Sequence, residues 1–117
     1  MGFEFEIKEH KKYVDIKLKG ELIDKLQSQP LLDKVEEYLQ NNVINFTFDL
    51  RDLKYLNSSG LNVMIQIFTK ARNNNGDAVL YHINKKINDL ILITKLNTIF
   101  KIADNQKEAV KLLNMEE

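Results

Sequence analysis

The sequence contains no cysteine, no tryptophan, one proline and four glycines among its 117 residues. The lack of cysteine excludes disulfide scaffolds, thiol nucleophiles and thiolate metal sites, and it is typical of a reducing compartment. So little proline and glycine leaves no candidate for a flexible linker. No apolar run approaches the roughly 20 residues of a membrane helix, and the N-terminal residues do not resemble a signal peptide. These absences predict one domain over residues 1–117, cytoplasmic and without membrane insertion.

An excess of charge of one sign is also missing, since 17 Lys and Arg residues balance 17 Asp and Glu residues. No overall positive field would therefore attract nucleic acid or an anionic membrane surface. We expect the partner to be a protein or a small molecule, and no nucleic acid.

Motifs for catalysis and for cofactor or metal binding are absent as well. The sequence has no Walker-type Gly-Lys-Ser, no Gly-x-Gly-x-x-Gly and no Gly-x-Ser-x-Gly. The two histidines, His10 and His82, lie far apart in the sequence, and Asp49 and Asp52 have no nucleophile motif nearby. We therefore expect no enzymatic activity, no cofactor and no metal site.

Alternation of apolar and polar residues predicts an N-terminal hairpin of two strands. In the first strand Phe3, Phe5 and Ile7 alternate with Glu4, Glu6 and Lys8; in the second Val14, Ile16 and Leu18 alternate with Asp15, Lys17 and Lys19. Gly20 is expected to end the second strand. Further strands are predicted over residues 43–50, 77–81 and 98–102.

Four helices are predicted between and after these strands. The first begins at Pro30, a favoured first helical position; the second begins near Asn57 and Ser58; Asn84 and Asp104 cap the third and fourth. Their buried faces are predicted to carry Leu31, Leu32, Val35, Tyr38 and Leu39, then Leu61, Met64, Ile65 and Phe68, then Ile87, Leu90 and Ile91, and finally Ala109, Leu112 and Leu113.

The order of these elements is ββαβαβαβα. Strands that alternate with helices require right-handed parallel crossovers. The predicted fold class is therefore α/β, with a mixed, mostly parallel sheet, an N-terminal antiparallel hairpin and four helices.

The most informative stretch is residues 48–61, which reads FDLRDLKYLNSSGL. It predicts a buried strand, a short polar loop over residues 51–56 with an apolar anchor at Leu56, and small polar residues at the start of a helix. The first turn of a helix has unpaired N–H groups and a partial positive charge, so Asn57 or Ser58 can cap it and an anion is tolerated there. A phosphoryl group on Ser58 would change this surface without disrupting the fold.

This stretch resembles the signature of STAS domains, the family of bacterial anti-sigma factor antagonists. In that signature a strand ending in Asp-Leu is followed, after a few residues, by Asp-Ser-Ser/Thr-Gly-Leu at the start of a helix. Elsewhere Gly20-Glu21-Leu22 resembles the first partner-facing loop of the family, residues 73–80 its glycine-containing turn into a strand, and residues 95–100 its Gly-Leu-x-x-hydrophobic-Phe run. The resemblance covers essentially the whole chain and implies the STAS fold.

The resemblance implies a protein-binding switch in which an anti-sigma factor, itself a serine kinase of the GHKL type, phosphorylates Ser58. The unmodified form would bind the anti-sigma factor and the phosphorylated form would release it, and a serine phosphatase would reverse the modification. Ser59 would be the neighbouring, unmodified hydroxyl. We expect a monomer or weak dimer. The predicted partner-binding residues are Glu21, Leu22, Asp24, Asn57, Ser58, Ser59, Gly60 and Asn62.

Two residues depart from the family pattern, and alternatives stay open. Asn57 stands where the family usually has Asp, and Ile23 precedes Asp24 where antagonists commonly have Asp directly. The neutral Asn57 favours an alternative function as an assembly subunit of a lipid-transport ABC system or of another signalling complex, without phosphorylation. A small enzyme or ligand-binding domain is a third, weaker alternative. Val63 and Ile67 are interpreted as core residues rather than as part of a partner patch.

Overall fold

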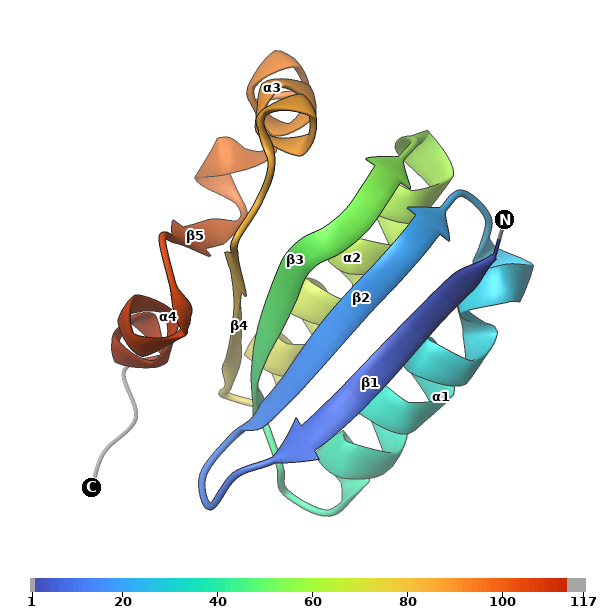
Figure 1. Ribbon diagram of the computed structural model, residues 1–117. Coiled ribbons are helices and arrows are strands. Elements are labelled where there is room, and N and C mark those ends of the chain that lie inside the picture. The colour runs from blue at the N-terminus through green and yellow to red at the C-terminus, as the bar shows by residue number, and fades with distance from the viewer. Residues whose placement is uncertain (1, 114–117) are drawn as a thin grey trace.

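The chain is described by a computed structural model over residues 2–113 (Figure 1). In chain order its elements are β1 (Phe3–Glu9), β2 (Val14–Leu22), α1 (Lys25–Gln40), β3 (Asn45–Leu56), α2 (Ser58–Asn73), β4 (Asp77–Tyr81), α3 (Lys85–Ile93), the 3₁₀ helix η1 (Leu96–Thr98), β5 (Lys101–Ala103) and α4 (Gln106–Leu112). The predicted order ββαβαβαβα is confirmed. Across residues 2–113, no helix is long and apolar enough to cross a membrane.

The five strands form one sheet in the order β1-β2-β3-β4-β5. Strands β1 and β2 pair antiparallel, from Phe3 opposite Gly20 to Glu9 opposite Val14. The pairs β2–β3, β3–β4 and β4–β5 are parallel. The predicted mixed, mostly parallel sheet with an N-terminal antiparallel hairpin is therefore confirmed.

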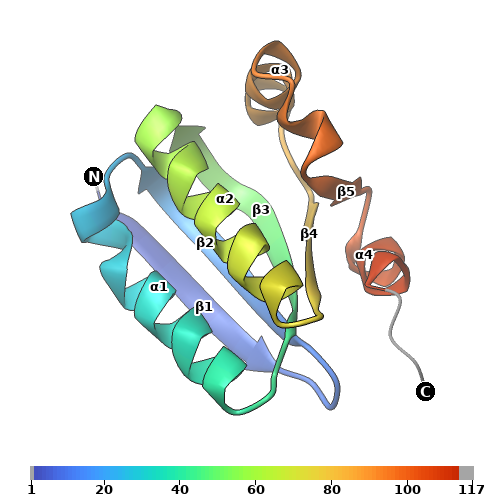
Figure 2. The same cartoon turned by 180° about the vertical axis from the view of Figure 1, so that it is seen from behind.

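The helices are divided between the two faces of the sheet. Helices α1 and α2 lie side by side across one face, as the view from behind shows (Figure 2). Helix α4 packs on the opposite face, against β4 and β5. The side chains of β4 alternate accordingly: Ala78 and Leu80 join the main core, whereas Val79 and Tyr81 pack with Ala109 of α4. Helix α3 lies beyond the carboxyl ends of β3 and β4.

The main core lies between the sheet and helices α1 and α2. Its largest fully buried side chains are Phe46, Phe48, Phe68, Ile16, Leu18, Leu22, Leu31, Leu50, Leu53, Met64 and Ile67. Val63 and Ile67 are 1% and 0% exposed, so their interpretation as core residues is confirmed.

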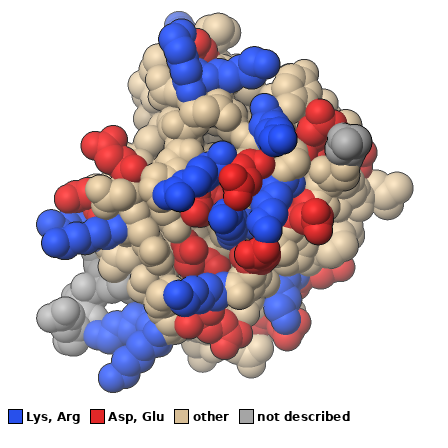
Figure 3. Space-filling model, viewed as in Figure 1, with Lys and Arg blue, Asp and Glu red and all other residues tan. Residues whose placement is uncertain are grey.

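On the other face, no helix of residues 2–113 lies across β1 and β2 (Figure 1), and charged side chains of both signs are interleaved there (Figure 3). Lys19 pairs with Glu6 across β1 and β2, and the ammonium of Lys17 lies 3.1 Å from the Asp52 carboxylate across β2 and β3. These pairs place opposite charges side by side on the uncovered part of the sheet and keep it hydrophilic.

Strands β2 and β3 are longer than predicted. Gly20 does not end β2, and the predicted loop over residues 51–56 is the second half of β3. The two strands stay paired to Leu22 opposite Leu56, through two register shifts. Gly20 has a φ of +87° at the second shift, a conformation that glycine adopts without strain. The register shifts interrupt the regular alternation of apolar and polar residues, so the sequence pattern did not reveal the full length of either strand.

The ends of three other elements also differ from the prediction. Helix α1 begins before Pro30, because the Asp24 carboxylate accepts a hydrogen bond of 2.6 Å from the Gln27 N–H and fixes an earlier start. Helix α4 is capped by Asn105 instead of Asp104. The last strand begins at Lys101, after η1. Among the predicted buried residues, Leu112 is exposed, and Tyr38, Ile65 and Leu90 are only partly buried.

Candidate functional site

Asn57 connects the end of the sheet to the start of helix α2. Its side-chain oxygen accepts a hydrogen bond of 2.9 Å from the Gly60 N–H, which caps the helix. Its side-chain amide nitrogen donates a bond of 3.0 Å to the carbonyl of Ile23, in the connection between β2 and α1. A carboxylate could accept the first bond but could not donate the second. The neutral amide at this position therefore has a structural role of its own.

Gly60 lies where helix α2 approaches the end of β2 most closely. A Cβ atom at Gly60 would lie 2.1 Å from the carbonyl oxygen of Leu22 and 2.7 Å from a methyl group of Leu56. Only glycine fits without a shift of the backbone. The close contact fixes the first turn of α2 against the sheet, so the position of Ser58 is set by backbone packing.

Ser58 and Ser59 are the first two residues of α2, and both are exposed. Within residues 2–113, neither hydroxyl makes a side-chain hydrogen bond, since Asn57 provides the cap. The first turn contains no acidic residue. The hydroxyl of Ser58 is therefore accessible at the positive end of a helix, next to backbone N–H groups that favour an anion.

The predicted partner-binding residues gather at this end of the domain, but two of them are not on its surface. Leu22 is fully buried at the end of β2, so the predicted loop over Gly20-Glu21-Leu22 is in fact strand. Gly60 is buried by its contact with that strand. The exposed members of the predicted set are Asp24, Ser58, Ser59 and Asn62, with Glu21 and Asn57 partly exposed beside them.

An apolar groove beside Ser58 was not predicted. It has a volume of about 420 Å³ and is lined by Tyr55, Leu56, Asn57, Ser58, Lys86, Ile87, Asp89, Leu90 and Ile93. Tyr55 at the end of β3 is 46% exposed, and Ile93 at the end of α3 is 78% exposed. Ile93 is out of phase with the buried Ile87 and Ile91 of its helix, and this is a signal in the sequence that indicates an apolar surface here.

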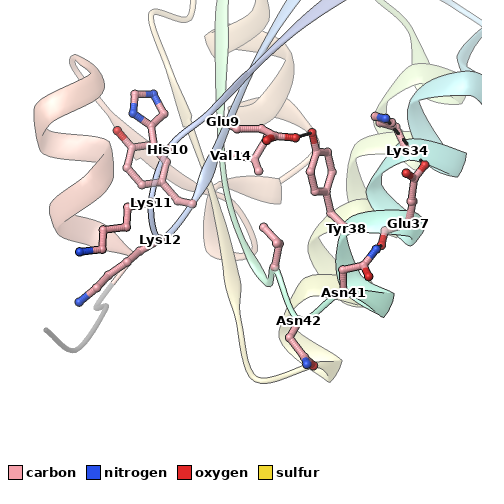
Figure 4. Close-up of a pocket in the computed structure, with 12 residues that line it drawn as sticks. Glu9, His10, Lys11, Lys12, Val14, Lys34, Glu37, Tyr38, Asn41 and Asn42 are labelled. Atoms are coloured by element: carbon pink, nitrogen blue, oxygen red, sulfur yellow. Dashed lines mark hydrogen bonds and ion pairs between the residues drawn. The ribbon is translucent and has the colours of Figure 1, made fainter.

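A second pocket, of about 370 Å³, lies at the opposite end of the domain, between the turn from β1 to β2 and the end of α1 (Figure 4). There the Tyr38 hydroxyl donates a hydrogen bond of 2.6 Å to the Glu9 carboxylate. Burial and that carboxylate raise the pKa of Tyr38 to about 12. The pocket is lined by both lysines and glutamates, and the Tyr38 hydroxyl that faces it is already hydrogen-bonded. This pocket is therefore not part of the candidate site at Ser58.

The two histidines, His82 and His10, make contacts with different residues. His82 Nδ1 lies 3.1 Å from the Asp49 carboxylate, and the Arg51 guanidinium lies beside the same ring. The other histidine, His10, stacks on Tyr13, with ring centroids 4.4 Å apart. Within residues 2–113, no three His, Cys, Asp or Glu side chains lie close enough together to hold a metal ion.

The sequence model of the STAS domain family matches residues 4–109. The chain therefore belongs to the STAS domain family, as its resemblance to the family signature predicted.

Similar proteins match over almost their whole length. The anti-sigma-B factor antagonist of Listeria monocytogenes is 29% identical over 109 residues, which are 92% of this chain and 95% of the relative. A solved structure of a putative anti-sigma factor antagonist from Thermotoga maritima has a TM-score of 0.82 and 24% identity, covering 95% of each chain. The Bacillus cell fate determinant SpoIIAA, solved in its phosphorylated form, has a TM-score of 0.72 and 18% identity over 95% of this chain and 100% of its own. The two structures establish the common fold.

Proposed function

We propose that this protein is an anti-sigma factor antagonist that is switched off by phosphorylation of Ser58. It binds an anti-sigma factor that is also a serine kinase of the GHKL type, and it thereby frees a sigma factor. The observation that carries the proposal is the exposed Ser58 hydroxyl at the first position of α2, left available because Asn57 provides the helix cap. The names of the relatives that match nearly the full chain support the same function.

Release of the partner follows from the charge that phosphorylation adds. A phosphoryl group brings about −1.5 to −2 charges at neutral pH. At Ser58 the helix N-terminus stabilises this charge within the protein, whereas a partner packed on the same surface would have to desolvate it. A loss of about 1–3 kcal/mol weakens binding about tenfold to a hundredfold. A serine phosphatase would restore the binding form.

The proposal is tested by incubating the protein with ATP and each purified anti-sigma kinase of the source organism, followed by mass spectrometry. We expect one added phosphate on Ser58, none in Ser58→Ala, and normal modification of Ser59→Ala as the matched control. Failure of every kinase to modify Ser58 would exclude the phosphorylation switch. In binding assays, Ser58→Ala is expected to bind the anti-sigma factor and Ser58→Asp to bind it more weakly.

A second candidate function is assembly with a lipid-transport ABC system. It is favoured by the neutral amide of Asn57, which holds the start of α2 without the acid that a kinase target usually has beside it. Affinity capture from cells separates the two functions. Co-purification of a soluble kinase supports the switch, and co-purification of a membrane ATPase supports the assembly subunit.

A further inference from the structure

The apolar groove beside Ser58 has two walls from different parts of the chain. Tyr55, Asn57 and Ser58 come from the end of β3 and the start of α2, and the opposite wall comes from α3. Leu56 and Ile87 are 5% and 2% exposed and form the floor. Exposed aromatic and aliphatic side chains at the rim are typical of protein interfaces, where they act as anchors.

The groove contains one lysine whose charge no acidic residue of the groove balances. Of its two charged lining residues, Asp89 already pairs with Lys85, a residue that does not line the groove, at 3.0 Å. The other, Lys86, lies in the first turn of α3 and lines the groove opposite Ser58. An occupant that complements this groove therefore has apolar side chains and a carboxylate.

We propose that Lys86 couples the state of Ser58 to partner binding. In the unmodified protein, the groove takes an apolar segment of the anti-sigma factor, and Lys86 pairs with a carboxylate of that segment. In the phosphorylated protein, Lys86 pairs with the phosphate on Ser58 across the groove. The phosphate belongs to the same molecule and carries more charge than a carboxylate, so it competes at a high effective concentration. This inference rests on the proposed function and adds a residue that transmits the modification.

The test measures binding of the purified anti-sigma kinase by calorimetry, with unmodified protein and with phosphoserine incorporated genetically at position 58. We expect Lys86→Gln to weaken binding of the unmodified protein about fivefold, the effect of a partly exposed ion pair. The same substitution should reduce the loss of affinity caused by phosphoserine by a similar factor. Tyr55→Ala and Ile93→Ala should each weaken binding about tenfold or more.

Two residues outside the groove provide controls. Lys107→Gln removes the same charge from an exposed lysine of α4 that neither lines the groove nor pairs with a residue that lines it, and Leu92→Ala truncates an exposed apolar side chain of α3 that does not line it. Neither should change binding. Equal binding by Lys86→Gln and Lys107→Gln, or an unchanged phosphoserine effect in Lys86→Gln, would overturn the inference while leaving the antagonist function intact. A wild-type protein that binds no anti-sigma kinase would overturn both.

Discussion

The two ends of helix α2 use the same residue types but are held in different ways. At the first end Asn57 caps the helix, and Gly60 brings it against the carbonyl of the neighbouring strand. At the last end Asn74 closes the helix, and Gly76 makes a similar close approach to the carbonyl of Ile44. The backbone packing is thus alike at both ends.

The difference lies in charge. At the last end Arg72 and Lys101 both pair with the Asp77 carboxylate, which ties α2 to β4 and β5. Nearby, Lys70 pairs with Glu36 of α1 at 2.9 Å. The first end has no ion pair in its first turn and is held by the neutral amide of Asn57. Ion pairs hold the last end, whereas the charge that the proposed phosphorylation would add at Ser58 would break no existing ion pair in the first turn.

The largest expected effect tests the packing that both ends share. Gly60→Ala should destabilise the protein by about 3 kcal/mol, because its Cβ would meet backbone atoms of β2, which cannot move aside as a side chain can. The exposed neighbour gives the control, since Ser59→Ala should change stability by less than about 0.5 kcal/mol. Urea denaturation measures both. Equal stabilities would mean that α2 is not fixed to the sheet at this point.

The next effect concerns the charged end. Burial by itself would raise the pKa of the Asp77 carboxyl, but hydrogen bonds from Lys101, the Ala78 N–H and Arg72 outweigh it and lower the pKa. Asp77→Asn should cost about 2 kcal/mol at neutral pH. Because the folded pKa lies below the unfolded value of about 3.9, the stabilisation is present above that pH and is lost as the pH falls further.

Chemical denaturation at several pH values checks this expectation. The stability difference between the wild type and Asp77→Asn should be constant near neutral pH and should shrink below about pH 4. A difference that stays constant through the acid range would contradict the role of the Asp77 carboxylate.

The two hydrogen bonds of Asn57 can be separated by two substitutions, of which the second has a smaller effect than Asp77→Asn. Asn57→Ala loses both bonds and should cost about 2 kcal/mol. Asn57→Asp keeps the cap but places a carboxylate next to the Ile23 carbonyl, and it should cost about 1 kcal/mol. Thermal denaturation of the three proteins gives the order of stability. An Asp variant more stable than the wild type would refute the role of the donated bond.

The smallest effect on stability is expected at Ser58 itself. Ser58→Asp adds a negative charge at the helix N-terminus, so the free energy of unfolding should stay within about 0.5 kcal/mol of the wild type or increase slightly. Urea denaturation measures it alongside the binding assay. If Ser58→Asp unfolded the domain, weaker partner binding by that variant would reflect loss of structure and the comparison of the two ends would fail.

The parts of the fold that sequence predicted well have local signals. The strand over residues 77–81 and the helix cap at Asn84 agree with the structure residue for residue. The second half of β3 was missed because its buried residues, Leu50, Leu53 and Leu56, are three apart, which is not the period of a regular strand. Its identity as a strand depends on pairing with β2 through register shifts, a non-local property.

For the candidate site too, sequence predicted the local features but not those that depend on contacts between distant segments. The position of Ser58 at the start of a helix followed from the residues around it, and so did the capping ability of Asn57. The second bond of Asn57, to Ile23, joins segments that are far apart in the sequence, so no local pattern reveals it. Likewise, the burial of Leu22 and the groove under Tyr55 depend on where β2 and α3 are placed by the whole fold.

The strand order β1-β2-β3-β4-β5 has a consequence for how the protein is made. Each strand lies beside the strand that precedes it in the chain, so no strand has to insert between two that have already paired. On the ribosome, the sheet can grow by one strand at a time as each is synthesised. The bonds that fix the start of α2 come from residues up to Gly60. The surface at Ser58 can therefore form early, whereas the groove must wait for α3.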